Sequence, residues 1–111
     1  MGDALANPWR GEVALTLDGV AHRCRLTLGA LAELEAELGE GDLISLVQRF
    51  EIGRFSSRDM LALLAAGLRG GGSEISRENL AQAEIEGGVM QATKVAAQLL
   101  ALSFALPSGD A

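Results

Sequence analysis

The sequence predicts an α+β fold that is mostly helical, with an N-terminal β-hairpin followed by about five α-helices in a single compact domain. Three observations predict this fold. Residues 11–28 alternate apolar and polar side chains around an Asp-Gly pair, which is the pattern of a hairpin. From residue 28 onward, apolar side chains recur at three- and four-residue steps, which is typical of helices. The chain has 111 residues, a length that suits one domain.

The hairpin has a register that its turn determines. Asp18 and Gly19 both tolerate the positive φ of a type I′ turn. This turn places three residue pairs on one face: Leu17 with Val20, Leu15 with His22, and Val13 with Cys24. An isolated hairpin is marginally stable in water, so we expect this largely apolar face to pack against the helices.

The helices follow from apolar stripes and from capping residues at their ends. They are expected over residues 28–38 and 43–52, from 57 to the glycine run 70–72, over 77–86 and over 89–106. Thr27, Asp42, Ser56 and Ser76 are candidate N-caps, and Gly39 and Gly53 are candidate stops. The stripe of the first helix is Leu28, Leu31, Leu34 and Leu38. The polar segment 77–86 is expected to be short or mobile, and the apolar helix 89–106 to be the centre of the core.

The ends of the chain are expected to lie outside the domain. The expected boundaries are a flexible tail at residues 1–10, the domain at 11–106 and a short tail at 107–111. We expect Pro8 and Trp9 to dock the first tail, because a lone tryptophan usually packs against a core. The N-terminus lacks the basic start and apolar run of a signal peptide.

Composition and charge exclude several classes of partner. The net charge is −6, which argues against nucleic acid, because phosphate binding needs a surplus of Lys and Arg. The same charge argues against anionic membranes. The most apolar stretch, 89–106, carries Gln91, Lys94 and Gln98, so we interpret it as a buried helix and predict no membrane span. Cys24 is the only cysteine, which fits a reducing cytoplasm.

No pattern in the sequence predicts a catalytic residue, a metal site or a cofactor. The glycine run 70–72 follows a helix and has no adjacent Lys, so it reads as a helix stop with a linker rather than as a phosphate-binding loop. His22 and Cys24 share a strand face, but zinc needs three or four ligands. A small enzyme that uses His22 is the hypothesis that we rank last.

Two surfaces are candidates for binding a protein. Acidic residues crowd the first helix and the turn after it: Glu33, Glu35, Glu37, Glu40 and Asp42. They form either a solvated face or a docking surface for a basic partner. The apolar surplus of the chain is either fully buried or leaves a patch exposed, and exposed patches usually mark partner sites. Leu80 and Ile85 are the large apolar residues of segment 77–86.

Several strings resemble a known family over about residues 10–106. They are GEVALTLDG, LTLGALAELEAELG, GRFSSRD and LLAAGLRGGG, followed by an apolar C-terminal helix. Together they resemble the small tail proteins of gene transfer agents, which are phage-like particles of alphaproteobacteria. The family has carried two labels, tail tube protein and tail assembly chaperone. Tube subunits resemble β-sandwiches or barrels, whereas this chain offers two convincing strands, so the sequence favours the chaperone.

The resemblance implies partners and a place of action. Such a chaperone would bind the tape-measure protein and the tail tube protein in the bacterial cytoplasm, or in association with phage-like particles. The alternative is a structural tail (tube) component, and a second copy of the chain stays open as a partner. The residues that we predict to bind protein are Glu33, Glu37, Glu40, Leu80 and Ile85. The family supplies no catalytic residues to carry over.

Overall fold

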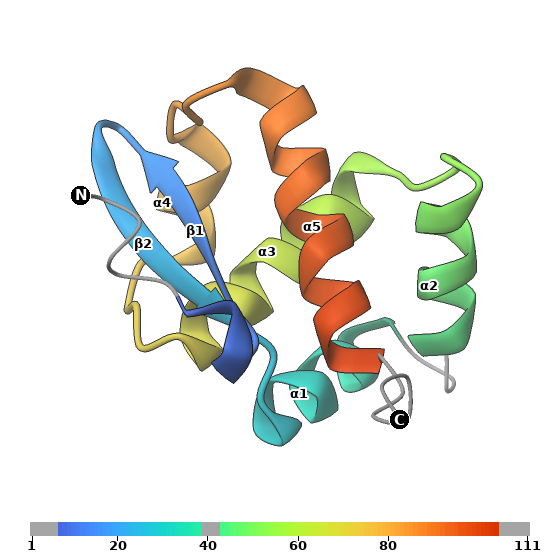
Figure 1. Ribbon diagram of the computed structural model, residues 1–111. Coiled ribbons are helices and arrows are strands. Elements are labelled where there is room, and N and C mark those ends of the chain that lie inside the picture. The colour runs from blue at the N-terminus through green and yellow to red at the C-terminus, as the bar shows by residue number, and fades with distance from the viewer. Residues whose placement is uncertain (1–6, 39–42, 105–111) are drawn as a thin grey trace.

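The computed structural model describes residues 7–38 and 43–104. Its elements are the 3-10 helix η2 (Pro8–Arg10), strands β1 (Glu12–Leu17) and β2 (Val20–Arg25), and helices α1 (Leu28–Leu38), α2 (Leu43–Glu51), α3 (Ser57–Gly70), α4 (Arg77–Gln82) and α5 (Gly88–Phe104). Figure 1 shows the hairpin and α4 on one side of α3 and α5, with α2 on the other side. The predicted hairpin followed by five helices is therefore confirmed.

The hairpin has the predicted register. Leu17 pairs with Val20, and the two further predicted pairs follow along the antiparallel ladder. Asp18 has φ 50° and Gly19 φ 81°, as a type I′ turn requires. The face is not dry along its whole length, because Val20 is 58% exposed. The covering helix α3 meets β2 at its other end, near Arg25, so the expectation of a fully covered face is wrong beside the turn.

The centre of the core is α3 rather than the C-terminal helix that we expected. Every residue from Ala62 to Leu68 is buried, and α3 contacts β2, α1, α4 and α5. Small side chains on α3 let these neighbours approach from several directions at once. Helix α5 packs on β1, α3 and α2, with Val95 and Leu99 fully buried.

Glycines allow α3 to end directly against β2. A Cβ on Gly70 would lie 2.0 Å from the carbonyl oxygen of Arg25, and one on Gly71 would lie 1.9 Å from that of Arg23. Neither separation is possible for a real side chain. The glycine run does stop the helix as predicted, and it also lets two backbones touch.

The start of α3 is tied to α2. Ser56 is the N-cap, as predicted, and it forms a capping box with Asp59, in which each side chain accepts a hydrogen bond from the other residue's backbone N–H. Asp59 also accepts two hydrogen bonds from the guanidinium of Arg49, at 2.9 and 3.0 Å. Burial raises the pKa of Asp59, but the hydrogen bonds from Arg49 and Ser56 outweigh it and leave the pKa below its ordinary value.

The segment expected as helix 77–86 is only half helical. Helix α4 ends at Gln82, and the following residues run alongside the end of β1. Ile85 forms a bridge with Leu17, and the backbone N–H of Asp18 donates to the carbonyl of Glu84 at 2.8 Å. Pairing with β1 satisfies backbone groups that a longer helix would have satisfied internally, so the chain leaves the helix early.

Two expected burials are wrong, and several expectations concern residues outside the described ranges. Trp9 is 96% exposed and does not dock on the core, and Leu28 is 83% exposed at the start of its predicted apolar stripe. Trp9 lies on the short helix η2 ahead of the first strand, and Leu28 is the first residue of α1. The predicted roles of Gly39, Asp42 and the two tails fall largely outside the described residues, as does Glu40.

Candidate functional site

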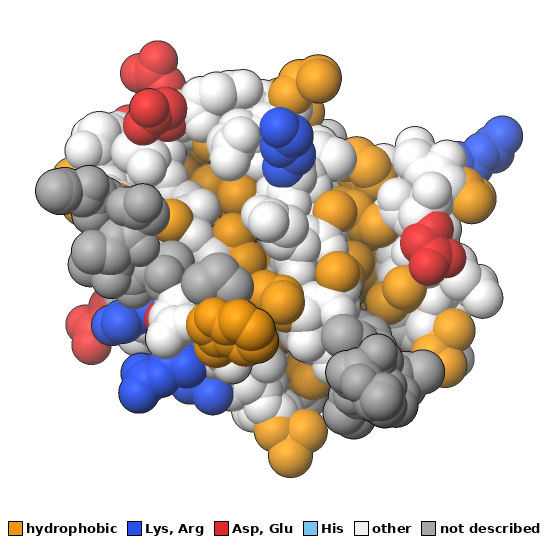
Figure 2. All heavy atoms as spheres, viewed as in Figure 1, with side chains coloured by type: hydrophobic (Ala, Val, Ile, Leu, Met, Phe, Trp, Pro, Cys, Tyr) orange, Lys and Arg blue, Asp and Glu red, His pale blue; other side chains and the backbone are white. Residues whose placement is uncertain are grey.

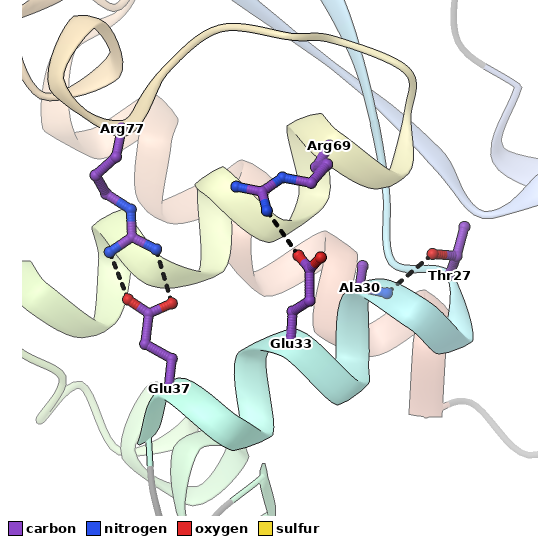
Figure 3. A network of polar contacts seen from close by, with 6 residues as sticks. All are labelled: Thr27, Ala30, Glu33, Glu37, Arg69 and Arg77. Atoms are coloured by element: carbon purple, nitrogen blue, oxygen red, sulfur yellow. Dashed lines mark hydrogen bonds and ion pairs between the residues drawn. The ribbon is translucent and has the colours of Figure 1, made fainter.

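The acidic face of α1 is engaged within the molecule. The carboxylate of Glu33 accepts a hydrogen bond from Arg69 of α3 at 2.9 Å, and that of Glu37 accepts two from Arg77 of α4. Figure 3 shows both pairs reaching from α1 to the neighbouring helices. The four side chains line a hollow of about 340 Å³. The hydrogen bonds from Arg77 hold the pKa of Glu37 below its ordinary value, against the opposing effect of partial burial. These two predicted contact residues therefore tie three helices together.

The two apolar residues that we selected meet in one groove. Leu80 is only 4% exposed, and Ile85 is half-buried. Both line a hollow of about 430 Å³ between α3, α4 and the start of α5. The apolar residues that line it with them are Phe55, Met60, Leu61, Leu64, Ala81, Ala83, Val89 and Ala92, and among the described residues Ser57 is the one polar member of the lining. We call this hollow the apolar groove.

The apolar groove opens to solvent, and exposed charged residues adjoin its lining residues in the chain. Val89, on the first turn of α5, is 74% exposed although it lines the groove. Glu84 and Glu86 flank Ile85 and are exposed, and Arg58 is exposed next to Ser57 at the start of α3. The volume lies in the range of roughly 300–1,000 Å³ that is typical of ligand-sized pockets. The groove can therefore accept apolar side chains from a partner, with acidic residues at the end nearest the hairpin.

Sequence reasoning missed most of this groove. Met60, Leu61 and Leu64 recur at the steps of an apolar helix stripe, which in sequence indicates core, whereas Met60 and Leu61 are only half-buried and line the groove. The sequence does carry one indication of the groove, which is the breadth of the apolar stripe on α3. Adjacent apolar residues at 60 and 61 make this stripe wider than the face that one neighbouring helix covers.

His22 and Cys24 do not form a reactive pair. The imidazole Nδ1 of His22 lies 3.3 Å from the hydroxyl of Ser73. Cys24 is buried beneath α3, and burial raises the pKa of its thiol to about 12. Within the described part of the chain, no three His, Cys, Asp or Glu residues lie close enough to hold a metal ion.

The family comparison agrees with the resemblance of the sequence strings. The model of a family described as phage tail tube protein, GTA-gp10, matches residues 10–105, almost the whole chain. The chain belongs to this family. As a phage tail protein, it acts through contact with other tail components. No curated protein and no solved structure matches it. Among the described residues, no helix is both long enough and apolar enough to cross a bilayer.

Proposed function

We propose that this phage tail protein is a tail assembly chaperone of a gene transfer agent or related phage-like particle. It would bind the tape-measure protein and the tail tube protein while the tail forms. The observation that carries the proposal is the apolar groove, a solvent-open hollow lined almost entirely by apolar side chains. Exposed apolar surface of this kind usually marks a protein-binding site.

The shape and chemistry of the groove fit a helix of the partner. Amphipathic helices dock by inserting anchors at i, i+3, i+4 and i+7 into an apolar groove between helices. Tape-measure proteins are long and helical, so they present such stripes repeatedly. The exposed Glu84 and Glu86 on either side of Ile85 would favour a helix whose apolar stripe is flanked by Lys or Arg.

The alternative is a structural subunit that stays in the tail, and the family description as a tube protein favours it. The architecture supports the chaperone instead. Within the described residues, the sheet has two strands plus the single bridge at Ile85. Tube subunits resemble β-sandwiches or barrels that stack into rings, and a two-stranded hairpin offers little sheet for such stacking. We further propose that the protein is not an enzyme and that it acts in the bacterial cytoplasm.

The proposal is tested by capture from particle-producing cells. Tagged wild-type protein should retain the tape-measure protein and the tube protein, identified by mass spectrometry. Val89→Glu places a charge in the groove on the first turn of α5, where an acidic residue suits the helix dipole. It should reduce capture by about tenfold or more, because burying a charge costs more than 1.4 kcal/mol.

A matched control separates the groove from surface chemistry in general. Ile44→Glu makes the same kind of change on the first turn of α2, at an exposed position that does not line the groove. It should leave capture unchanged. The absence of both tail proteins from the wild-type eluate would refute the chaperone role.

A further inference from the structure

The most exposed large apolar side chain of the described residues stands on a turn whose backbone is fixed by hydrogen bonds. Trp9 is 96% exposed on η2. The side-chain oxygen of Asn7 accepts from the backbone N–H of Trp9 at 3.0 Å, and the carbonyl of Asn7 accepts from Arg10 and Glu12. The buried Glu12 side chain in turn accepts from the backbone N–H of Asn7 at 2.9 Å. These bonds order the backbone of the turn, and the indole that it carries lies in solvent. An exposed indole contributes far less free energy than an aromatic ring buried at an interface.

The Trp9 turn and the apolar groove lie at opposite ends of the hairpin. The turn precedes Glu12, the first residue of β1, whereas Ile85 of the groove pairs with Leu17, the last. A six-residue strand spans about 17–20 Å. Trp9 therefore cannot reach the groove of its own chain, although it can reach the groove of another.

The charges at the two ends are complementary. Arg10 and Arg25 are exposed at the Trp9 end, and Asp18, Glu84 and Glu86 are exposed at the groove end. Figure 2 shows basic side chains beside a large apolar group near η2, and acidic side chains above the hairpin turn. Opposite charges on complementary surfaces steer association and fix orientation.

We propose that, when no tail protein occupies the apolar groove, this protein self-associates head to tail, with Trp9 of one copy seated in the groove of a second copy. Arg10 of the first copy then lies beside Glu84 and Glu86 of the second. The groove volume of about 430 Å³ is sufficient for an indole ring. Because the two surfaces differ, each added copy leaves one Trp9 and one groove open, so the chain forms a ring or an open row rather than a symmetric dimer.

Tryptophan fluorescence gives a direct test in the purified protein. Trp9 is the only tryptophan and the chain has no tyrosine, so the emission reports Trp9 alone. The emission should shift to the blue as concentration rises from micromolar to millimolar, in step with the mass measured by sedimentation. Trp9→Ala should weaken self-association by about tenfold or more. Leu28→Ala, at an exposed leucine outside both surfaces, should leave it unchanged.

Mixing two blocked variants tests the head-to-tail arrangement. Ala81→Arg places a cation in the groove, at an exposed position of α4, where it repels the incoming Arg10. This variant and Trp9→Ala should each be monomeric alone, and their mixture should form a 1:1 dimer through the one intact pair of surfaces.

Two results would overturn the proposal: a wild-type protein that stays monomeric at millimolar concentration, or blocked variants that do not pair. Both are measured without any tail protein present. A negative result in these measurements therefore refutes self-association alone. The chaperone proposal is tested independently, by capture of the tail proteins.

Discussion

Replacing Gly71 by alanine tests the packing of α3 against the hairpin. The added Cβ would lie 1.9 Å from the carbonyl oxygen of Arg23 and 2.6 Å from its carbon. Carbon–oxygen contacts are ordinarily roughly 3.3–3.6 Å, so one backbone must move by more than about 1 Å. Overpacking usually costs about 1–3 kcal/mol. Because the obstacle is backbone and cannot rotate away, we expect a loss of about 3 kcal/mol in the free energy of unfolding.

The matched control is the same substitution in α1. Gly71 has φ −87°, a conformation that alanine adopts freely, so its cost would come from the contact alone. At Gly29 a new Cβ meets only the Thr27 hydroxyl oxygen, at 3.9 Å. Gly29→Ala should therefore stabilise the protein by about 0.5–1 kcal/mol, the helix preference of alanine over glycine. Urea unfolding followed by circular dichroism measures both, and equal stabilities for the two variants would refute this account of the packing.

Three further predictions concern single side chains. Asp59→Asn should cost about 2 kcal/mol in urea unfolding, because it weakens the capping box and removes the ion pair between Asp59 and Arg49. The pKa of Asp59 is lower in the folded protein than in the unfolded chain, where it is about 3.9. Its contribution to the free energy of unfolding is therefore complete above about pH 4 and is lost as the pH falls through the folded pKa. The difference in unfolding free energy between wild type and Asp59→Asn should shrink below about pH 4. The Cys24 thiol, with a pKa raised to about 12 by burial, should react with Ellman's reagent only after denaturation, and rapid reaction of the native protein would contradict the burial. Glu37→Gln should cost less than about 1 kcal/mol, because its ion pair is partly exposed, whereas Glu35→Gln should have no measurable effect on unfolding.

Local patterns predicted most of the fold. The Asp18-Gly19 pair determined the hairpin register, and Ser56 marked the start of α3, because turns and caps depend on residues a few positions apart. Pairings across the chain were not predicted. The bridge between Leu17 and Ile85 ended α4 early, and no local pattern around residue 85 distinguishes a strand from a helix.

The protein-binding role of the selected residues stays a prediction, and the structure shows only where these residues lie. Leu80 and Ile85 were chosen as the large apolar residues of a polar segment, and the structure brings them into one groove. The partners of Glu33 and Glu37 lie 36 and 40 residues away, on α3 and α4. From the sequence alone these carboxylates look like a free acidic surface, because no residue close to them in the chain indicates which arginines pair with them.

Quantitative mass spectrometry of purified particles tests the chaperone role most directly. The copy number of this protein is compared with that of the tube protein, both in producing cells and in finished particles. A chaperone that leaves the tail after assembly should be abundant in the cells and nearly absent from the particles. A copy number in the particles comparable to that of the tube protein would contradict the account and identify the chain as a structural subunit of the tail.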